Sequence, residues 1–223
     1  DYDMWLRLTK SFTIMGLSTP LVKIRIHDSN TVRDTAAFCR FRLAVVQKHF
    51  GTSEGDPSTW TEEKRRAYAL AFREVAIRYG QDEDPAQKWR HLERAIAVWP
   101  ELLNRLDTFY ELVCNVQPRG YRGDATSLDI EGNGAEILGW LDDLFIKTGP
   151  AFDVLRHNAY GNAYLALAML SDQADRWGKA RHYMMRAVGA TPSLLASYQV
   201  LRRLVKLFVG RKVVNIIKSR RDN

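Results

Sequence analysis

The apolar residues of this chain recur mainly three and four positions apart, the spacing that places them on one face of an α-helix. Capping residues, glycines and prolines set the expected helix bounds. Asp34 or Thr35 is expected to cap the helix that ends near His49, and Thr59 with Glu62 forms a capping box for the next one. The expected helices cover about 35–49, 60–79, 85–99, 101–116, 135–147, 151–172, 176–190 and 193–208.

The N-terminal part follows a different pattern. Met4, Trp5 and Leu8 share one face of an expected helix over the first ten residues, and Trp5 is expected to lie in a core. Gly16 and then Pro20 interrupt this pattern. In the stretch that follows, apolar and basic residues alternate, which predicts a strand with one buried face. The alternating residues are Val22, Ile24 and Ile26 against Lys23, Arg25 and His27.

Two windows of the helical region match each other at identical spacing, each residue of the second lying 92 positions after its counterpart. The matched residues are Phe72, Val75, Ala76, Leu92, Ala95 and Pro100 in the first window, and Tyr164, Leu167, Ala168, Met184, Ala187 and Pro192 in the second. This order resembles the tetratricopeptide pattern, in which small residues let two antiparallel helices approach closely. Because such arrays need at least three units, residues 101–147 are expected to form a degenerate middle pair. The alternative is that unrelated antiparallel helices share this spacing by chance.

Composition and motifs narrow the function classes. No apolar run reaches the roughly 18 residues that a membrane span needs. The two cysteines, Cys39 and Cys114, are expected to be small buried residues in a reducing, cytoplasmic setting. The sequence has no P-loop, no nucleotide-binding glycine motif after a strand, and no serine-hydrolase or zinc-protease motif. The isolated histidines of the helical region are not expected to bind a metal: His49, His91, His157 and His182.

The net charge of +7 is concentrated at the C-terminus, because the rest of the chain holds equal numbers of basic and acidic residues. The eight basic residues are Arg202, Arg203, Lys206, Arg211, Lys212, Lys218, Arg220 and Arg221. One interpretation makes them the solvent side of a helix that caps the last hairpin. Another places them on an anionic membrane surface, at the inner face of the membrane. Nucleic acid is not an expected partner, because no nucleic-acid-binding module accompanies the basic segment.

Residues 1–34 carry a resemblance to a known family. DYDMWLRL followed by TPLVKIRIHDSNTVRD resembles the end of the catalytic domain in inverting family 2 glycosyltransferases of the GT-A fold. In that family a helix reading Tyr-Asp-Leu-Trp-Leu-Arg precedes a strand reading roughly Leu-Val-Arg-Tyr-Arg-Ile-His. The resemblance covers about a seventh of the chain. The expected fold is therefore mainly α: a short helix-strand remnant of a GT-A catalytic domain over 1–33, then an array of antiparallel, tetratricopeptide-like helical hairpins over 34–223.

The resemblance implies roles for three residues. Asp1 corresponds to the catalytic base, the carboxylate that takes a proton from the acceptor hydroxyl. His27 corresponds to a histidine near the diphosphate of the donor, and Arg25 is placed to neutralise the same charge. The acidic residue that precedes the base in the family is not in this sequence. No Asp-x-Asp lies where the metal motif of the family is expected, because Asp1-Tyr2-Asp3 has the spacing but belongs to the helix motif. This chain alone is therefore expected to bind no nucleotide sugar, no cofactor and no metal, and to be inactive. The full-length enzyme is expected to use Mn²⁺ or Mg²⁺.

Two functions are consistent with the sequence. In the first, the chain is the C-terminal part of a glycosyltransferase that transfers a sugar from a nucleotide-sugar donor to an unknown acceptor. Its helical region then contacts the acceptor, a protein partner or the membrane. In the second, the chain is a non-enzymatic scaffold whose helical hairpins offer a groove to a peptide or a second subunit. The N-terminal match is then a coincidence.

Overall fold

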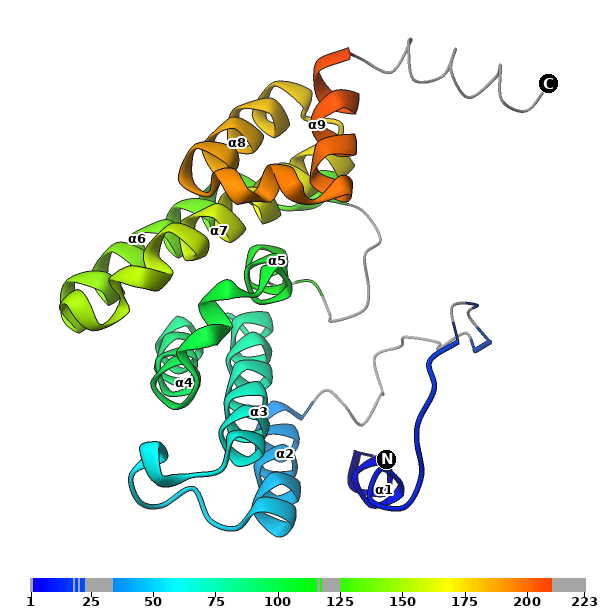
Figure 1. Cartoon of the computed structure of the whole chain (residues 1–223), viewed down its shortest axis with the longest axis vertical. Coiled ribbons are helices and arrows are strands. Elements are labelled where there is room, and N and C mark those ends of the chain that lie inside the picture. Colours follow the sequence, from blue (N-terminus) through cyan, green and yellow to red (C-terminus); the bar gives the residue numbers. More distant parts are fainter. Residues whose placement is uncertain are drawn as a thin grey trace. The chain divides into compact units, whose positions relative to one another are not determined.

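The chain is mainly helical in a computed structural model (Figure 1). The structure describes residues 2–17, 19, 21–22, 34–115, 117 and 125–209. These residues contain no strand. Of the expected strand, only Leu21 and Val22 are described and neither is in regular structure, while the rest lies outside the described residues. The chain divides into two compact units, Asp1–Trp99 and Pro100–Asn223. The expected boundary between a catalytic remnant and a helical region at 33/34 stays a prediction.

The described residues of the first unit form four α-helices. They are α1 (Tyr2–Leu8), α2 (Thr35–Phe50), α3 (Glu62–Gln81) and α4 (Pro85–Val98). Helix α3 packs along α4, and α2 packs on α3. Helix α3 is central and is therefore buried on most of its surface, whereas α1 has no buried residue.

The start of α2 confirms one cap, and the start of α3 corrects another. The Asp34 carboxylate accepts a hydrogen bond of 2.8 Å from the backbone N–H of Ala37. At α3 the cap is Thr61, whose hydroxyl accepts from the N–H of Lys64, and not Thr59. Thr59 instead belongs to a short 3-10 helix, Pro57–Thr59, which ends before α3 begins. The carboxylate of Asp56 caps this 3-10 helix. The expectation of a Thr59 capping box was wrong because that 3-10 helix intervenes.

The second unit contains α5 (Leu106–Cys114), α6 (Ile130–Thr148), α7 (Asp153–Gln173), α8 (Trp177–Ala190) and α9 (Tyr198–Val209). Helix α7 is the central element, and it packs against α5, α6 and α8. Helix α9 covers one side of α8 (Figure 1). Helices α5 and α6 also contact each other, and their role as a middle pair between the two matched windows stays a prediction.

Three helix starts in the second unit differ from the sequence prediction by five residues. The segments expected to begin helices near 101 and 193 open with separate 3-10 helices, η3 (Pro100–Asn104) and η6 (Pro192–Ala196). In a 3-10 helix the hydrogen bonds join residues three positions apart, so the chain is wound more tightly there than in α5 and α9. Helix α6 begins five residues earlier than the expected 135, because the Asp129 carboxylate accepts from the N–H of Gly132 and caps it. Gly132 and Gly134, which precede the expected start, therefore lie within α6.

The 92-residue spacing of the sequence windows extends to whole elements. Helices α4 and α8 begin and end at equivalent positions, η3 and η6 do the same, and α5 and α9 begin at equivalent positions. The loops joining α3 to α4 and α7 to α8 are also alike. Each has one residue with left-handed backbone at the equivalent position, Glu83 (φ 58°) and Asp175 (φ 57°). The run α3–α4–η3–α5 therefore recurs as α7–α8–η6–α9.

Small residues permit the close packing of α7. An added Cβ at Gly161 would lie 2.2 Å from Oγ1 of Thr191, and one at Gly134 of α6 would lie 2.7 Å from Cδ2 of Leu167. Ala168 and Ala187, both matched in the repeat, are completely buried in the core shared by α7 and α8. The repeat pattern therefore marks positions where helix backbones approach each other.

Candidate functional site

The three site residues implied by the family resemblance cannot be placed. Asp1, Arg25 and His27 lie outside the described residues, so their mutual geometry stays a prediction. Tyr2 and Asp3 follow Asp1 directly, and both have defined contacts in the first turn of α1.

Asp3 fixes α1 to the end of α2. Its carboxylate accepts hydrogen bonds of 3.0 and 3.1 Å from Nζ of Lys48 and lies 2.7 Å from Nε2 of His49. Arg7, one turn along α1, approaches the same carboxylate at 3.4 Å. The hydrogen bonds from Lys48, and then from His49, lower the pKa of Asp3 from 3.8 to about 2. Asp3 thus serves as a structural anion, charged throughout the neutral range.

A second contact holds the same helix. The guanidinium of Arg42, on α2, lies 3.5 Å from the centre of the Tyr2 ring, within the range of a cation–π interaction. Arg42 also forms an ion pair with Glu74 of α3. Tyr2, Arg42 and Glu74 therefore connect α1 through α2 to α3.

The apolar side chains of α1 and the segment after it are exposed. Trp5, expected in a core, is 50% exposed, so that expectation was wrong for this chain. The contacts of α1 with α2 come from its polar and aromatic residues Tyr2 and Asp3, and they leave the apolar side uncovered. The large exposed apolar residues of this segment are Met4, Trp5, Phe12, Ile14, Met15, Leu17, Leu21 and Val22. The segment that resembles a catalytic domain thus presents an apolar surface.

A groove of about 580 Å³ lies in the second unit between α6, α7 and α8. Tyr160 donates a hydrogen bond to the Asp142 carboxylate, and Arg186 donates one of 2.9 Å to the hydroxyl of Tyr164. Burial raises the pKa of Tyr160, and the hydrogen bond to Asp142 raises it further, so this phenol stays neutral. Arg156 and His157 complete the polar lining. The groove therefore combines two aromatic rings with an excess of basic side chains.

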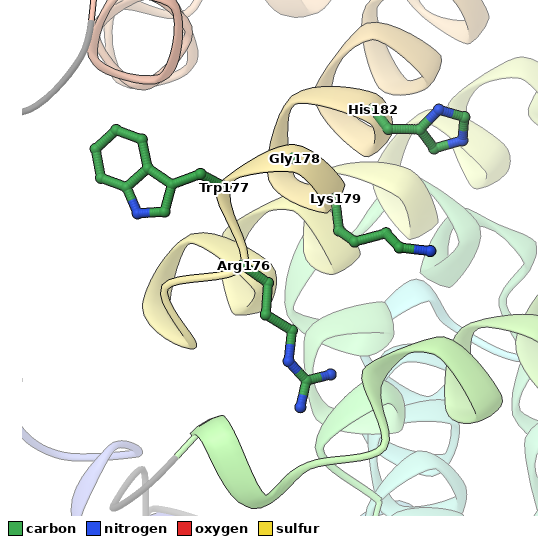
Figure 2. Close-up of a pocket in the computed structure, with 5 residues that line it drawn as sticks. All are labelled: Arg176, Trp177, Gly178, Lys179 and His182. Atoms are coloured by element: carbon green, nitrogen blue, oxygen red, sulfur yellow. The ribbon is translucent and has the colours of Figure 1, made fainter.

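A second hollow, of about 510 Å³, lies at the start of α8 (Figure 2). Arg176 donates to the carbonyl oxygens of Thr126 and Leu128, and Lys179 pairs with Glu131 at 2.8 Å. Figure 2 shows the side chains around Gly178 pointing in different directions. These cations are already engaged, and the hollow does not gather them around a common point.

The part of the chain that the structure describes contains neither a metal-binding cluster nor a reactive thiol. No group of three or more His, Cys, Asp or Glu residues there is arranged to hold a metal ion. Cys39 and Cys114 are both buried, and burial raises the pKa of Cys39 to about 11, so that its thiol stays protonated. Among the described helices, none is long and apolar enough to cross a membrane.

Sequence reasoning missed the groove on α6 to α8, because its residues come from three helices. One signal was present. Arg156, Tyr160 and Tyr164 recur every four residues and so line one side of α7. Tyr164 was interpreted only as a packing residue of the repeat, whereas the structure leaves it partly exposed in the groove.

Comparison with known proteins returned no match: no protein-family model fits the chain, and neither a curated protein nor a solved structure is detectably similar to it.

Proposed function

We propose that this chain is the C-terminal part of an inverting family 2 glycosyltransferase. The observation that supports the proposal best is a coincidence of two properties in one segment. Residues 1–34 carry both motifs that resemble the family, and residues 4–22 also hold the exposed apolar side chains. Many exposed large apolar side chains in one short segment favour a covering partner. The proposed partner is the rest of the catalytic domain.

The free energy available from burying these apolar side chains also supports a covering catalytic domain. Phe12, Met15 and Leu17 are each more than 60% exposed. Burying one such side chain contributes about 1.5–3 kcal/mol. A catalytic domain that covered these side chains would thus gain several kcal/mol of apolar burial.

In the proposed reaction, Asp1 takes the proton of the acceptor hydroxyl as that oxygen attacks the anomeric carbon of the donor. The bond from the sugar to the nucleoside diphosphate breaks, and Arg25 and His27 balance the charge of the departing diphosphate. A divalent cation, Mn²⁺ or Mg²⁺, would be bound by upstream residues and share that charge. Asp3, two positions after Asp1, would anchor the base to the helical region through Lys48 and His49.

We propose further that the helical region is an array of tetratricopeptide-like hairpins that positions an acceptor or a protein partner. The recurrence of α3–α4–η3–α5 as α7–α8–η6–α9 supports this interpretation. The groove lined by Tyr160, Tyr164 and Arg186 is the proposed contact surface, because aromatic rings and basic groups suit a polar or acidic ligand. The proposed setting is the cytoplasm or the inner face of its membrane.

The role of Asp1 is tested by substitution in the full-length protein. Asp1→Asn keeps the size of the side chain but removes the base, and loss of a general base lowers kcat by about 10²–10⁴-fold. Asp153→Asn, at an exposed carboxylate in the second unit, is the matched control and should transfer sugar at the unchanged rate. Equal melting temperatures for both variants would show that folding is intact. Transfer by Asp1→Asn at the rate of the control would rule out the proposed base.

The scaffold function is the second candidate, and the groove on α6 to α8 is the observation that favours it. If the chain is a scaffold, the apolar segment at residues 4–22 is not part of a catalytic domain. The scaffold function therefore predicts that the full-length protein transfers no sugar, and that Asp1→Asn changes nothing measurable.

A further inference from the structure

Helix α9 exposes a stripe of large apolar residues, which we call the α9 stripe: Tyr198, Leu201, Val205 and Phe208. The spacing of three, four and three residues places all four along one line of the helix. Their exposed fractions range from 45% for Leu201 to 75% for Tyr198. Val200 and Leu207 lie on another side of α9 and are buried in the core with α8. Helix α9 thus has apolar residues both on the side that packs against α8 and on the side exposed to solvent.

The internal repeat shows what covers this face elsewhere in the chain. By the 92-residue offset, Leu201 and Val205 correspond to Phe109 and Val113 of α5. Phe109 and Val113 are completely buried, and α5 is packed by the two helices that follow it, α6 and α7. The same face of α9 has no helix on it among the described residues.

Charge restricts what can cover the stripe. Arg202 is exposed beside Leu201, while Lys206 and Arg203 approach the buried carboxylate of Asp172 at 2.8 and 3.8 Å. From Arg202 to the end of the sequence there are eight basic residues and one acidic residue. Helix α6, which helps to cover α5, is by contrast acidic. Its charged residues are Glu131, Glu136, Asp142, Asp143 and Lys147.

We propose that the α9 stripe is the docking surface for an acidic amphipathic helix of a partner protein. A ridge with three- and four-residue spacing fits between the side chains of another helix. A second copy docked through its own α9, or residues 210–223 of the same chain, would bring further basic residues to Arg202, so charge disfavours both. A bilayer surface suits a broad apolar face, and much of the apolar face of α9 is already buried on α8. This inference goes beyond the proposed enzymatic function and does not depend on it.

The test uses the intact protein and a labelled synthetic peptide with the sequence of residues 129–149, the acidic amphipathic segment that forms α6. Fluorescence anisotropy should show saturable binding that weakens as salt rises. Leu201→Glu should weaken binding at least tenfold, and Arg202→Glu should weaken it severalfold. Val154→Glu replaces an 81% exposed apolar residue outside the stripe and should leave binding unchanged. A peptide with its acidic residues replaced by lysine should not bind.

Melting temperatures separate docking from folding. Leu201 is exposed in the free protein, so Leu201→Glu should leave the melting temperature of the unbound protein close to the wild-type value. A marked fall would show that another part of this chain already covers the stripe, and would overturn the proposal. Val205→Glu repeats the test at a second position.

Three other results would also overturn the proposal. The first is peptide binding that Leu201→Glu does not weaken. The second is no peptide binding together with binding to vesicles of anionic lipid that Leu201→Glu abolishes, which would assign the stripe to a membrane surface. The third is a wild-type dimer in analytical ultracentrifugation that the same substitution dissociates, which would assign the stripe to a second copy.

Discussion

Single residues in α6 show how the packing of a helix decides which side chains it tolerates. Gly134 faces Leu167 so closely that a methyl group would overlap that side chain, whereas Gly139, five residues along the same helix, has open space around its Cα. Both lie inside α6, so both have the low helix propensity of glycine. Only the contact with α7 distinguishes them.

Gly134→Ala should therefore destabilise the protein by about 1–3 kcal/mol, the usual effect of overfilling a packed core. Gly139→Ala, the matched control, should stabilise it by about 0.5–1 kcal/mol through helix propensity. Urea unfolding followed by circular dichroism measures both free energies. If Gly134→Ala proved as stable as Gly139→Ala, the close approach of α6 and α7 would be wrong.

Asp3 allows a test of how α1 is held. Its pKa is lowered from 3.8 to about 2 in the folded chain, so its contribution to stability is present above pH 3.8 and is lost as the pH falls through 2. The carboxyl carbon shift of Asp3 in an NMR titration should have its midpoint near 2. Lys48→Ala should move that midpoint toward 3.8, and Lys10→Ala, at an exposed lysine of the same unit, should not. A wild-type midpoint near 3.8 would show that α1 is not tied to α2 by this carboxylate.

The helices of the two repeats show how far the sequence allows structure to be predicted. The bounds of α4 and α8 were predicted to within one or two residues, because Pro85 and the apolar spacing define them. The 3-10 helices η3 and η6 were not predicted, because a tighter turn carries the same apolar positions as an α-helix. The burial of Trp5 was predicted wrongly, since burial depends on which surface lies opposite and periodicity does not reveal that. The groove was missed for the same reason.

The equivalent loops between the hairpin helices give a prediction at the scale of the element. Glu83 and Asp175 adopt left-handed backbone, which is unfavourable for residues with a side chain. Glu83→Gly and Asp175→Gly should each stabilise the protein by roughly 0.5–1 kcal/mol, because glycine adopts this conformation without strain. Asp82→Gly, next to Glu83 but with φ −90°, is the control and should destabilise. Chemical denaturation measures these effects, and destabilisation by both Glu83→Gly and Asp175→Gly would contradict the loop geometry.

For the whole molecule, the apolar surface of residues 4–22 is explained most simply as half of an interface. The helical region carries its own buried cores, whereas α1 buries nothing and is held by a few polar contacts. We propose that such an element gains its stability from a larger domain that covers it. On the family resemblance, we propose that this domain is the catalytic part of a glycosyltransferase.

Isothermal titration calorimetry with UDP-sugars and GDP-sugars in the presence of Mn²⁺ tests the central claim most directly. The full-length protein and this chain are titrated side by side, with Mn²⁺ alone as the blank. The account predicts that the full-length protein binds one of the nucleotide sugars and that this chain binds none. If neither binds a nucleotide sugar, the glycosyltransferase assignment is wrong and the chain is a helical interaction protein.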